Sequence, residues 1–265
     1  MNSPGNRIHK YPRTHHLQGS RLQPGDEDLG SEPFTTLEGR HVVIEEKLDG
    51  ANAAVSFDEE GKLLLQSRGH FLTGGGREKH FTLFKQWATA HTGALREILG
   101  SRYVLYGEWL FAKHTIFYDA LPHYFLEFDV LDTNRNAFLG TQERRALLGA
   151  SPVVPVPVLF SGTLPDPGAV PAYLGPSHYI LPGHLERLRE ACARLGLDAD
   201  RVLRETDPLT TMEGLYVKIE EEGIVQARYK FIRPSFLTTV LASESHWLNR
   251  PIVPNRLARG VDLFS

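Results

Sequence analysis

The sequence has almost no cysteine and no long apolar run. Cys192 is the single cysteine among 265 residues, so no disulfide can form within one chain, which is typical of a reducing compartment. The pattern around Cys192 indicates a small buried residue rather than a reactive thiol. No stretch approaches the ~18 consecutive apolar residues of a membrane span, and the N-terminus lacks an apolar signal region. We therefore expect a cytoplasmic protein that does not bind membranes.

An excess of charge of either sign is also lacking. The formal net charge is -3, so a surface that binds nucleic acid must be a local patch. Twelve histidines are present, but without the cysteine partners or the His-Glu-x-x-His spacing of a zinc site. No Gly-x-x-x-x-Gly-Lys-Ser/Thr loop occurs, which excludes a P-loop kinase activity.

The chain has enough apolar sequence for one domain, or for a domain with a small appendage. Hydrophobic residues make up 41% of it. Alternating apolar residues predict strands, and apolar residues at helical spacing predict helices. The strands are expected at 41–47, 51–57, 62–67, 103–110, 124–131, 213–219 and 224–231, and the helices at 79–99, 141–149, 182–195 and 235–246.

Two segments have little regular pattern. Residues 1–33 are rich in proline and glycine and indicate an N-terminal arm, either disordered or ordered over the functional site. Residues 151–171 are rich in proline and predict an extended connector with an edge strand at 156–160. Many strands with interspersed helices, without strict alternation, favour an α+β fold with antiparallel sheets.

Lys47 stands at the end of an apolar strand and begins the run Lys47-Leu48-Asp49-Gly50. Burial at such a position disfavours the charged ammonium and lowers the pKa of the lysine, and a neutral lysine is a nucleophile. On this stretch alone, a surface lysine at a hairpin turn is an equally good interpretation, because Asp-Gly is an ordinary hairpin signal.

Lys47-Leu48-Asp49-Gly50 and five later blocks resemble the covalent nucleotidyltransferases, which are the ATP-dependent ligases and the mRNA capping enzymes. The later blocks, in the expected order, are Gln66-Ser67-Arg68-Gly69, Leu105-Tyr106-Gly107-Glu108-Trp109, Leu126-Glu127-Phe128-Asp129-Val130, Glu213-Gly214-Leu215-Tyr216-Val217-Lys218 and Arg228-Tyr229-Lys230-Phe231. Together with Asn52, five residues after the lysine, they look most like the RNA ligase 2-type branch. The resemblance implies an α+β, ATP-grasp-like nucleotidyltransferase (adenylation) domain over 34–265, with antiparallel sheets flanked by helices and an insert at about 150–210.

The resemblance implies an ATP-dependent RNA ligase that joins 3′-OH and 5′-phosphate ends through lysyl-AMP and RNA-adenylate, with Mg²⁺ or Mn²⁺. Lys47 would be the nucleophile. Asp49 and Asn52 would serve the later steps, with Asn52 near the reacting RNA ends. Arg68 would contact the ribose or the incoming 5′-phosphate, for which its fixed fork of donors is suited.

Further site residues are implied by the same blocks. Glu46 would approach the adenine, and Phe128 would stack on it, with ordinary core packing as the alternative for Phe128. Glu108 and Glu213 would help to hold the divalent cation, and Glu108 also suits a contact to the ribose. A salt bridge in the core is the alternative for both carboxylates.

The last block supplies cations. Arg228 and Lys230 are two residues apart on a strand and therefore share one face, so both could reach the α-phosphate and lower the pKa of Lys47. The family usually has Lys-x-Lys here, and Lys230 is the closer match. Lys218 would contact the nucleotide by resemblance, but it lies five residues after Glu213, so on a regular strand the two would face opposite sides.

About 35 residues follow Lys230, too few for the OB-fold barrel that DNA ligases append. We therefore expect no appended OB-fold domain, and RNA contacts from the arm (Arg13 and Arg21 to phosphates), from the insert or from a partner. The resemblance also implies RNA repair beside an end-healing kinase and phosphatase. The alternatives are a DNA ligase or another polynucleotide adenylyltransferase, a capping guanylyltransferase, and an inactive nucleotide- or RNA-binding module.

Overall fold

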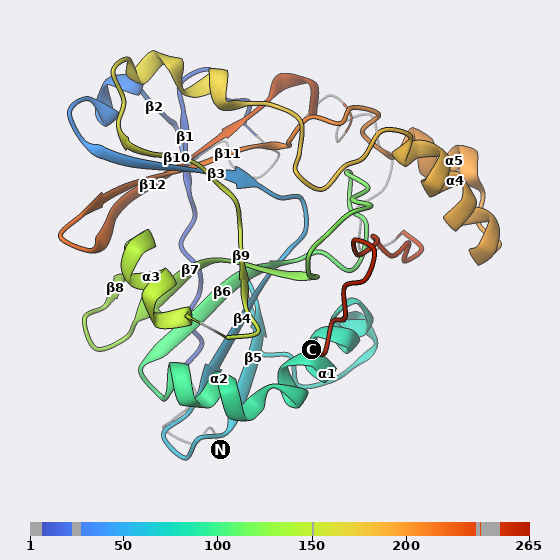
Figure 1. Cartoon of the computed structure of the whole chain (residues 1–265), viewed down its shortest axis with the longest axis horizontal. Helices are drawn as coiled ribbons and strands as arrows, with labels where there is room; N and C mark the ends of the chain where they lie inside the picture. The colour runs from blue at the N-terminus through green and yellow to red at the C-terminus, as the bar shows by residue number, and fades with distance from the viewer. Residues whose placement is uncertain (1–6, 23–27, 150, 237–238, 240–249) are drawn as a thin grey trace.

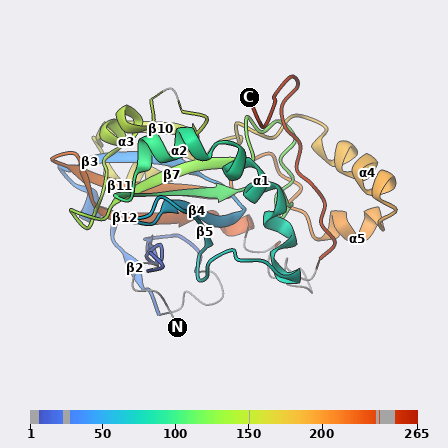
Figure 2. The ribbon, with the colours of Figure 1, turned by 90° about the horizontal axis from the view of Figure 1, so that it is seen from below.

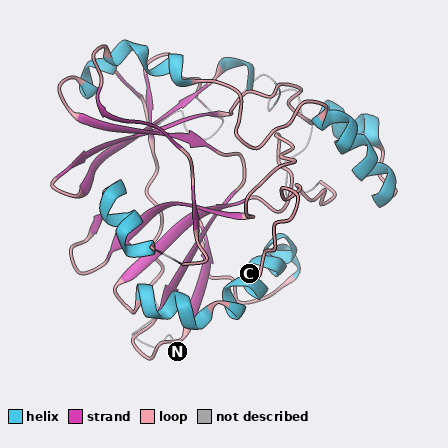
Figure 3. Ribbon diagram, viewed as in Figure 1, coloured by secondary structure: helices cyan, strands magenta, loops and turns pink. Residues whose placement is uncertain are grey.

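The computed structural model describes residues 7–22, 28–149, 151–236, 239 and 250–265. Its strands form two sheets that face each other (Figures 1 and 3). Sheet 1 has the order β10 (Val158–Thr163), β3 (His41–Lys47), β11 (Gly214–Glu221), β12 (Ile224–Ile232), β1 (His15–Leu17), β2 (Ser31–Glu32). Sheet 2 has the order β5 (Leu63–Ser67), β4 (Ala51–Phe57), β6 (Tyr103–Trp109), β7 (Phe125–Asp132), β8 (Ala137–Phe138), with β9 (Val154–Pro155) beside β7.

Most strand pairs are antiparallel, as the sequence predicts. In sheet 1, β3 pairs antiparallel with β10 and β11, and β11 forms a hairpin with β12. Glu222 and Gly223 close this hairpin with φ of 51° and 74°, the positive values that a tight two-residue turn between twisted strands favours. The parallel exceptions are β1 with β12, β1 with β2, and β7 with β9.

Each sheet buries its outer face under helices. On sheet 2 these are η2 (Gly76–Phe81), α1 (Thr82–Ala90) and α2 (Thr92–Leu99), which run along one side of the sheet in Figure 2. Phe84 and Trp87 of α1 stack 6.0 Å apart, and each lies 5.3 Å from Phe125 of β7. On sheet 1, η1 (Phe34–Leu37) and η3 (Pro167–Tyr173) bury Leu37 and Val170 with the apolar side chains of β3 and β11.

A small helical lobe lies to one side of both sheets (Figures 1 and 2). It consists of α4 (His184–Leu195) and α5 (Ala199–Arg204), whose buried residues pack against Phe117 and Val253. Cys192 of α4 has 0% exposed surface, so the prediction of a buried apolar cysteine is confirmed. None of the helices in the described ranges is both long and apolar enough to cross a membrane.

The strands and helices named from the sequence are found within about two residues of their predicted bounds, with three differences. The helix expected over 79–99 is η2, α1 and α2, because the backbone leaves helical geometry at His91 (ψ 14°). The helix α3 (Thr141–Leu148) matches its prediction. The elements that were not predicted are α5, β1, β2, β8, β9, η1 and η3. The helix expected over 235–246 falls mostly outside the described residues.

Candidate active site

Lys47, the last residue of β3, lies beside the first residues of β11. Its side chain is 22% exposed, and its Nζ donates to Oε1 and Oε2 of Glu213 at 2.7 and 2.8 Å. Lys47 is the register partner of Gly214. A Cβ on Gly214 would lie 2.2 Å from the Phe231 carbonyl oxygen, so only glycine allows β12 to approach this closely, and Glu213 is thereby held next to the lysine.

The protonation state of Lys47 differs from the prediction. Burial favours the neutral amine, but the carboxylates of Glu213, Glu108 and Asp49 outweigh it and raise the pKa of Lys47 above its ordinary value. In this state the lysine is an ammonium held by carboxylates rather than a free nucleophile. The expectation of a lowered pKa is therefore wrong for the protein without a nucleotide.

Glu108 of β6 and Glu213 are the acidic residues nearest to the lysine. Oε1 of Glu108 accepts a hydrogen bond from the Gly50 N–H at 3.0 Å, and a Cβ on Gly50 would come within 2.7 Å of the Trp109 carbonyl oxygen. Burial raises the pKa of Glu108 to about 8 and that of Glu213 to about 7. A hard divalent cation takes carboxylate oxygens as ligands and would favour the ionised forms that burial now disfavours, so these residues fit the expected metal.

Asp49 anchors a neighbouring loop. Its Oδ2 accepts hydrogen bonds from the N–H groups of Thr115 and Ile116, both at 2.7 Å, and its own N–H donates to the Tyr118 hydroxyl at 2.9 Å. His114 Nδ1 lies 3.9 Å from Asp49 Oδ1, and burial lowers the pKa of His114 to about 4, so the imidazole is neutral near pH 7. The Asp49 carboxylate thus fixes the loop that follows Trp109 against the Lys47 turn.

Asn52 lies on β4 of sheet 2, and Arg68 follows the end of the neighbouring strand β5. Asn52 of β4 is the register partner of Glu108 on β6, and its Oδ1 is buried without a hydrogen-bond partner. Arg68 follows the pair formed by Ser67 and Ala53 and is exposed. Asn52 therefore carries an unsatisfied acceptor on the strand next to Glu108.

Glu46 is fully engaged by the segment after η3. Its Oε1 accepts from the Ser177 hydroxyl at 2.5 Å, and its Oε2 pairs with His178 Nδ1 at 2.8 Å. Glu46 alternates with Lys47 along β3, so the two side chains leave the strand on opposite faces. The sequence predicted Glu46 near the adenine and gave no indication of Ser177 or His178.

A second set of charges, which we call the buried ion cluster, joins the two sheets farther along β3 and β11. Its members are Glu45, Glu127, Asp129, Arg144, Lys218 and Arg228. Arg144 of α3 is 0% exposed and bonds Glu45 and, at 3.1 Å, Glu127, while Lys218 lies 2.8 Å from Glu45 and 3.2 Å from Asp129. Nothing in the sequence distinguishes Arg144 from the exposed Arg145 beside it.

The structure separates the predicted phosphate-binding cations. Lys230 is buried, and its charge lowers the pKa of Glu213, against the larger effect of burial. Arg228 instead lies 3.5 Å from Asp129, with its guanidinium 3.9 Å from the Phe138 ring centre. Lys218 belongs to the buried ion cluster and not to the Lys47 pair. Only Lys230 of these three lies with the nucleophile, because Arg228 and Lys218 are register partners one step farther along the hairpin.

Phe128 of β7 contacts the buried ion cluster through its backbone and two tyrosines through its ring. Its carbonyl oxygen accepts from Lys218 and Arg144. Its ring centre lies 5.2 Å from that of Tyr11 and 6.2 Å from that of Tyr216. The ring is half-buried: it packs against the core and still exposes part of its surface.

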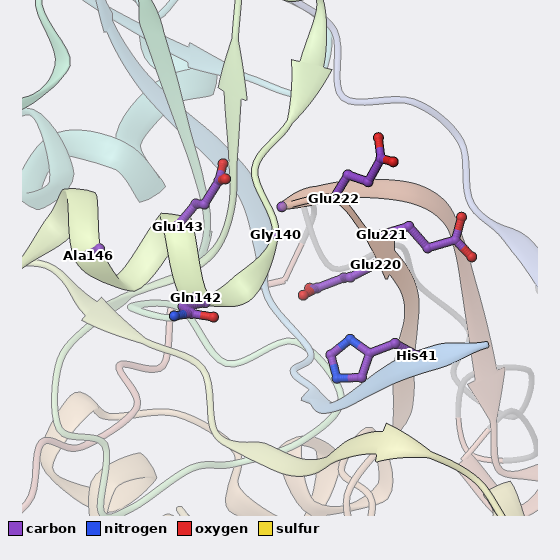
Figure 4. A pocket seen from close by; sticks show the side chains of 9 residues that line it. His41, Gly140, Gln142, Glu143, Ala146, Glu220, Glu221 and Glu222 are labelled. Carbon is purple, nitrogen blue, oxygen red and sulfur yellow. The ribbon is translucent and has the colours of Figure 1, made fainter. Parts of the chain in front are cut away.

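An acidic pocket of about 450 Å³ lies elsewhere (Figure 4). It is at the far end of β11 from Gly214, and its carboxylates include Glu220, which accepts from Thr141, and Glu221, which pairs with Arg40. Within the described part of the chain, no group of three or more His, Cys, Asp or Glu side chains could hold a metal ion. Because the pocket lies at the opposite end of β11, it is separate from the Lys47 site.

Comparison with known proteins agrees with the motif pattern. The family model described as RNA ligase matches residues 40–232. No curated protein matches the chain. Among solved structures, a mutant of Naegleria gruberi RNA ligase without ligand is 17% identical, with a TM-score of 0.55 over 90% of this chain and 60% of that one.

Two further structures of the same protein match. A mutant solved with ATP and Mn is 18% identical with a TM-score of 0.54 (89% and 60% of the two chains), and one with AMP and Mn is 17% identical with a TM-score of 0.52 (87% and 57%). The chain therefore spans about three fifths of the length of the structures it matches. At this identity the likeness speaks to the fold alone.

Proposed function

The chain belongs to the RNA ligase family, and on that premise we propose that it seals RNA 3′-OH and 5′-phosphate ends with ATP, through an AMP covalently bound to Lys47. The observation that carries the proposal is the Lys47–Glu213 pair at 2.7 and 2.8 Å, with Glu108 and Lys230 close by. The amine of Lys47 therefore lies with two carboxylates that can bind a divalent metal ion and with the ammonium of Lys230, which can bind a phosphate. This is the set of groups that nucleotidyl transfer to a lysine requires.

In the first step, Lys47 Nζ must leave Glu213, lose a proton and attack the α-phosphorus of ATP. The N–P bond forms as the bond from the α-phosphorus to the pyrophosphate oxygen breaks. Lys230, whose charge acts on Glu213, would neutralise charge on the α-phosphate. Because the resting lysine is an ammonium held by carboxylates, this step depends on removing Glu213 from Nζ.

A divalent cation would supply that change, since on Glu108 and Glu213 it would occupy the carboxylates that now raise the pKa of Lys47. The raised pKa values of both carboxyls, about 8 and about 7, support this assignment. A cation of either kind, Mg²⁺ or Mn²⁺, would stabilise their ionised forms. The remaining ligands would come from phosphate oxygens and water.

In the later steps an oxygen of the RNA 5′-phosphate would attack the α-phosphorus, and the P–N bond would break as Lys47 regains a proton. The RNA 3′-OH would then attack the 5′-phosphorus and release AMP. Asn52, with its unsatisfied Oδ1 beside Glu108, would orient the RNA ends, and the exposed Arg68 would bind a ribose or a phosphate. Asp49 would act by holding the loop at Thr115 and Ile116 against the site.

For the nucleobase, we propose the Phe128 ring as the stacking surface, with Lys218 and Arg228 setting the charge around it. The carbonyl of Phe128 is held by Lys218 and Arg144, which fits a ring with a defined orientation. Glu46 would act indirectly, through Ser177 and His178. Work in RNA repair beside a kinase and a phosphatase that prepare the ends, with RNA contacts from Arg13 and Arg21, is part of the proposal.

The test is incubation with α-labelled ATP or GTP, with a divalent cation, and then with nicked or broken RNA and matching DNA. We expect label from ATP alone to stay on the protein through a bond that acid breaks, as a P–N bond does, and to be released when RNA ends are sealed. Label from GTP would indicate a guanylyltransferase. Sealing of DNA but not RNA, or no label at all, would contradict the proposal.

A further inference from the structure

The N-terminal arm crosses from one sheet to the other (Figure 1). At its start, the His9 carbonyl oxygen accepts from the Tyr106 hydroxyl at 2.8 Å and from Gln66 Nε2 at 2.7 Å, both on sheet 2. At its end, β1 pairs with β12 of sheet 1, with His16 opposite Lys230. Residues 9–17, which we call the arm segment, are therefore fixed at both ends.

Tyr11 is the residue of the arm segment that enters the space between the sheets. It is 8% exposed, and its ring centre lies 5.1 Å from Tyr106, 5.2 Å from Phe128 and 5.6 Å from Phe138, all edge to face. Such contacts constrain the angle between rings as well as their distance. Tyr11 therefore limits the positions that the Phe128 ring can take.

The Tyr11 hydroxyl connects the same ring to the buried ion cluster. It donates to Asp129 Oδ2, and its oxygen lies 2.7 Å from the Tyr216 hydroxyl, which in turn lies 2.7 Å from Thr14 Oγ1. Asp129 directly follows Phe128, and it is ionised, because Lys218 and Arg228 hold its pKa low against the effect of burial. One side chain of the arm thus holds both the ring of Phe128 and the carboxylate next to it.

We propose that Tyr11 is a positioning residue for the nucleobase: it fixes the Phe128 ring, through ring contacts and through Asp129, in the orientation that stacks on adenine. This inference rests on the proposed function. It makes the arm segment a built part of the nucleotide site, in addition to the RNA contact proposed for Arg13. Tyr11 does not contact the Lys47–Glu213 pair, so it should affect the binding of ATP and not the chemistry at Nζ.

The matched control is Tyr229. It is also a tyrosine with 8% exposure, and it lies on β12 opposite His15 of the arm. Its side chain packs in the core on the outer face of sheet 1. Removal of the Tyr229 ring should leave a similar cavity, but away from Phe128.

The experiment measures the rate of protein–AMP formation against ATP concentration for wild type, Tyr11→Phe, Tyr11→Ala and Tyr229→Ala, with melting temperatures of all four. For Tyr11→Ala we expect the half-saturating ATP concentration to rise by about tenfold or more, from the loss of the ring contacts. For Tyr11→Phe, which keeps the ring and loses the hydrogen bonds of the hydroxyl to Asp129 and Tyr216, we expect a rise of about threefold. The maximal rate should stay within about twofold of wild type in both, because Lys47 is untouched.

Tyr229→Ala should lower the melting temperature without changing the half-saturating ATP concentration. An unchanged ATP dependence in both Tyr11 variants, or an equal shift in Tyr229→Ala, would overturn the inference. If Tyr11→Ala does not fold, Tyr11→Phe decides by its threefold shift. Wild type that takes no label would instead overturn the proposed function, and the inference with it, so the two failures are distinguishable.

Discussion

Two groups of charged side chains lie between the same sheets, and they are organised in opposite ways. In the buried ion cluster, three cations meet three carboxylates. Asp129 keeps a lowered pKa despite its burial, whereas burial raises the pKa of Glu127 to about 7. Around Lys47, two lysines, Lys47 and Lys230, face the three carboxylates Glu213, Glu108 and Asp49. The pKa values of Glu213 and Glu108 rise to about 7 and about 8. The first group is balanced within the protein, whereas the second has an excess of acid that a cation from outside can relieve.

The comparison separates structural charges from reactive ones more clearly than residue type does. Lys218 and Lys47 are both lysines on adjacent strands of sheet 1, yet Lys218 is 1% exposed and Lys47 22%. A buried ion pair that loses one partner leaves an uncompensated charge and destabilises the fold. A remaining partner that a proton or a ligand can neutralise does not destabilise the fold in this way. The following variants test this distinction.

The largest effect is expected at the nucleophile. Lys47→Ala should abolish the AMP adduct while the protein stays folded, because Glu213, with a pKa of about 7, can take a proton in place of its partner. Lys47→Arg keeps the ion pair and should also form no adduct. Mass spectrometry after incubation with ATP measures both; an adduct on either variant would show that another residue is the nucleophile.

Asn52 lies beside Glu108 but offers an acceptor without a charge. Asn52→Ala should form the adduct normally and seal RNA about a hundredfold more slowly, because the reacting ends lose a positioning group. Ser56→Ala, two alternations along the same face of β4, is the control and should seal normally. Single-turnover sealing by the adenylated variants measures the difference, and wild-type sealing by Asn52→Ala would remove Asn52 from the site.

In the buried ion cluster the effect should be on stability. Arg144→Met leaves Glu127 without its arginine and Glu45 with Lys218 alone, and should lower the unfolding free energy by about 3–5 kcal/mol. Arg145→Met, at the next and exposed position of α3, should change it by less than about 0.5 kcal/mol. Urea denaturation compares the two. Equal stability of both variants would mean that the cluster is not a structural one.

The smallest effect is a pH dependence from Glu108. Its pKa is raised from 4.5 to about 8 by burial, so the folded protein holds this proton to higher pH than the unfolded chain does. Without metal, the resulting stability is complete below about pH 4.5 and is lost progressively as the pH rises through about 8. Glu108→Gln should remove this slope and Glu59→Gln, an exposed position, should not. Denaturation in chelator at several pH values measures it, and an unchanged slope in Glu108→Gln would place the titration elsewhere.

The fold and most of the Lys47 site could be predicted from the sequence. The strands carry period-two patterns strong enough to locate them, and the glycines at 50 and 214 mark places where a neighbouring backbone approaches too closely for a side chain. The short strand β1 escaped prediction because its pairing with β12 depends on sequence more than 200 residues away. The roles of Tyr11 and Arg144 escaped it for the same reason, since a lone tyrosine in an irregular arm and one arginine of a charged helix carry no local pattern.

The sequence alone determined where the strands lie along the chain and that Lys47 stands at a strand end. It could do so because alternation and short spacings act within a few residues. The tertiary structure decided which charges meet. In the folded protein, Lys218 and Arg228 form ion pairs with Asp129, and Lys230 acts on Glu213. Lys47 is held as an ammonium rather than a free amine. Those outcomes depend on distances between side chains as much as 166 residues apart and on burial between two sheets, which no local pattern records.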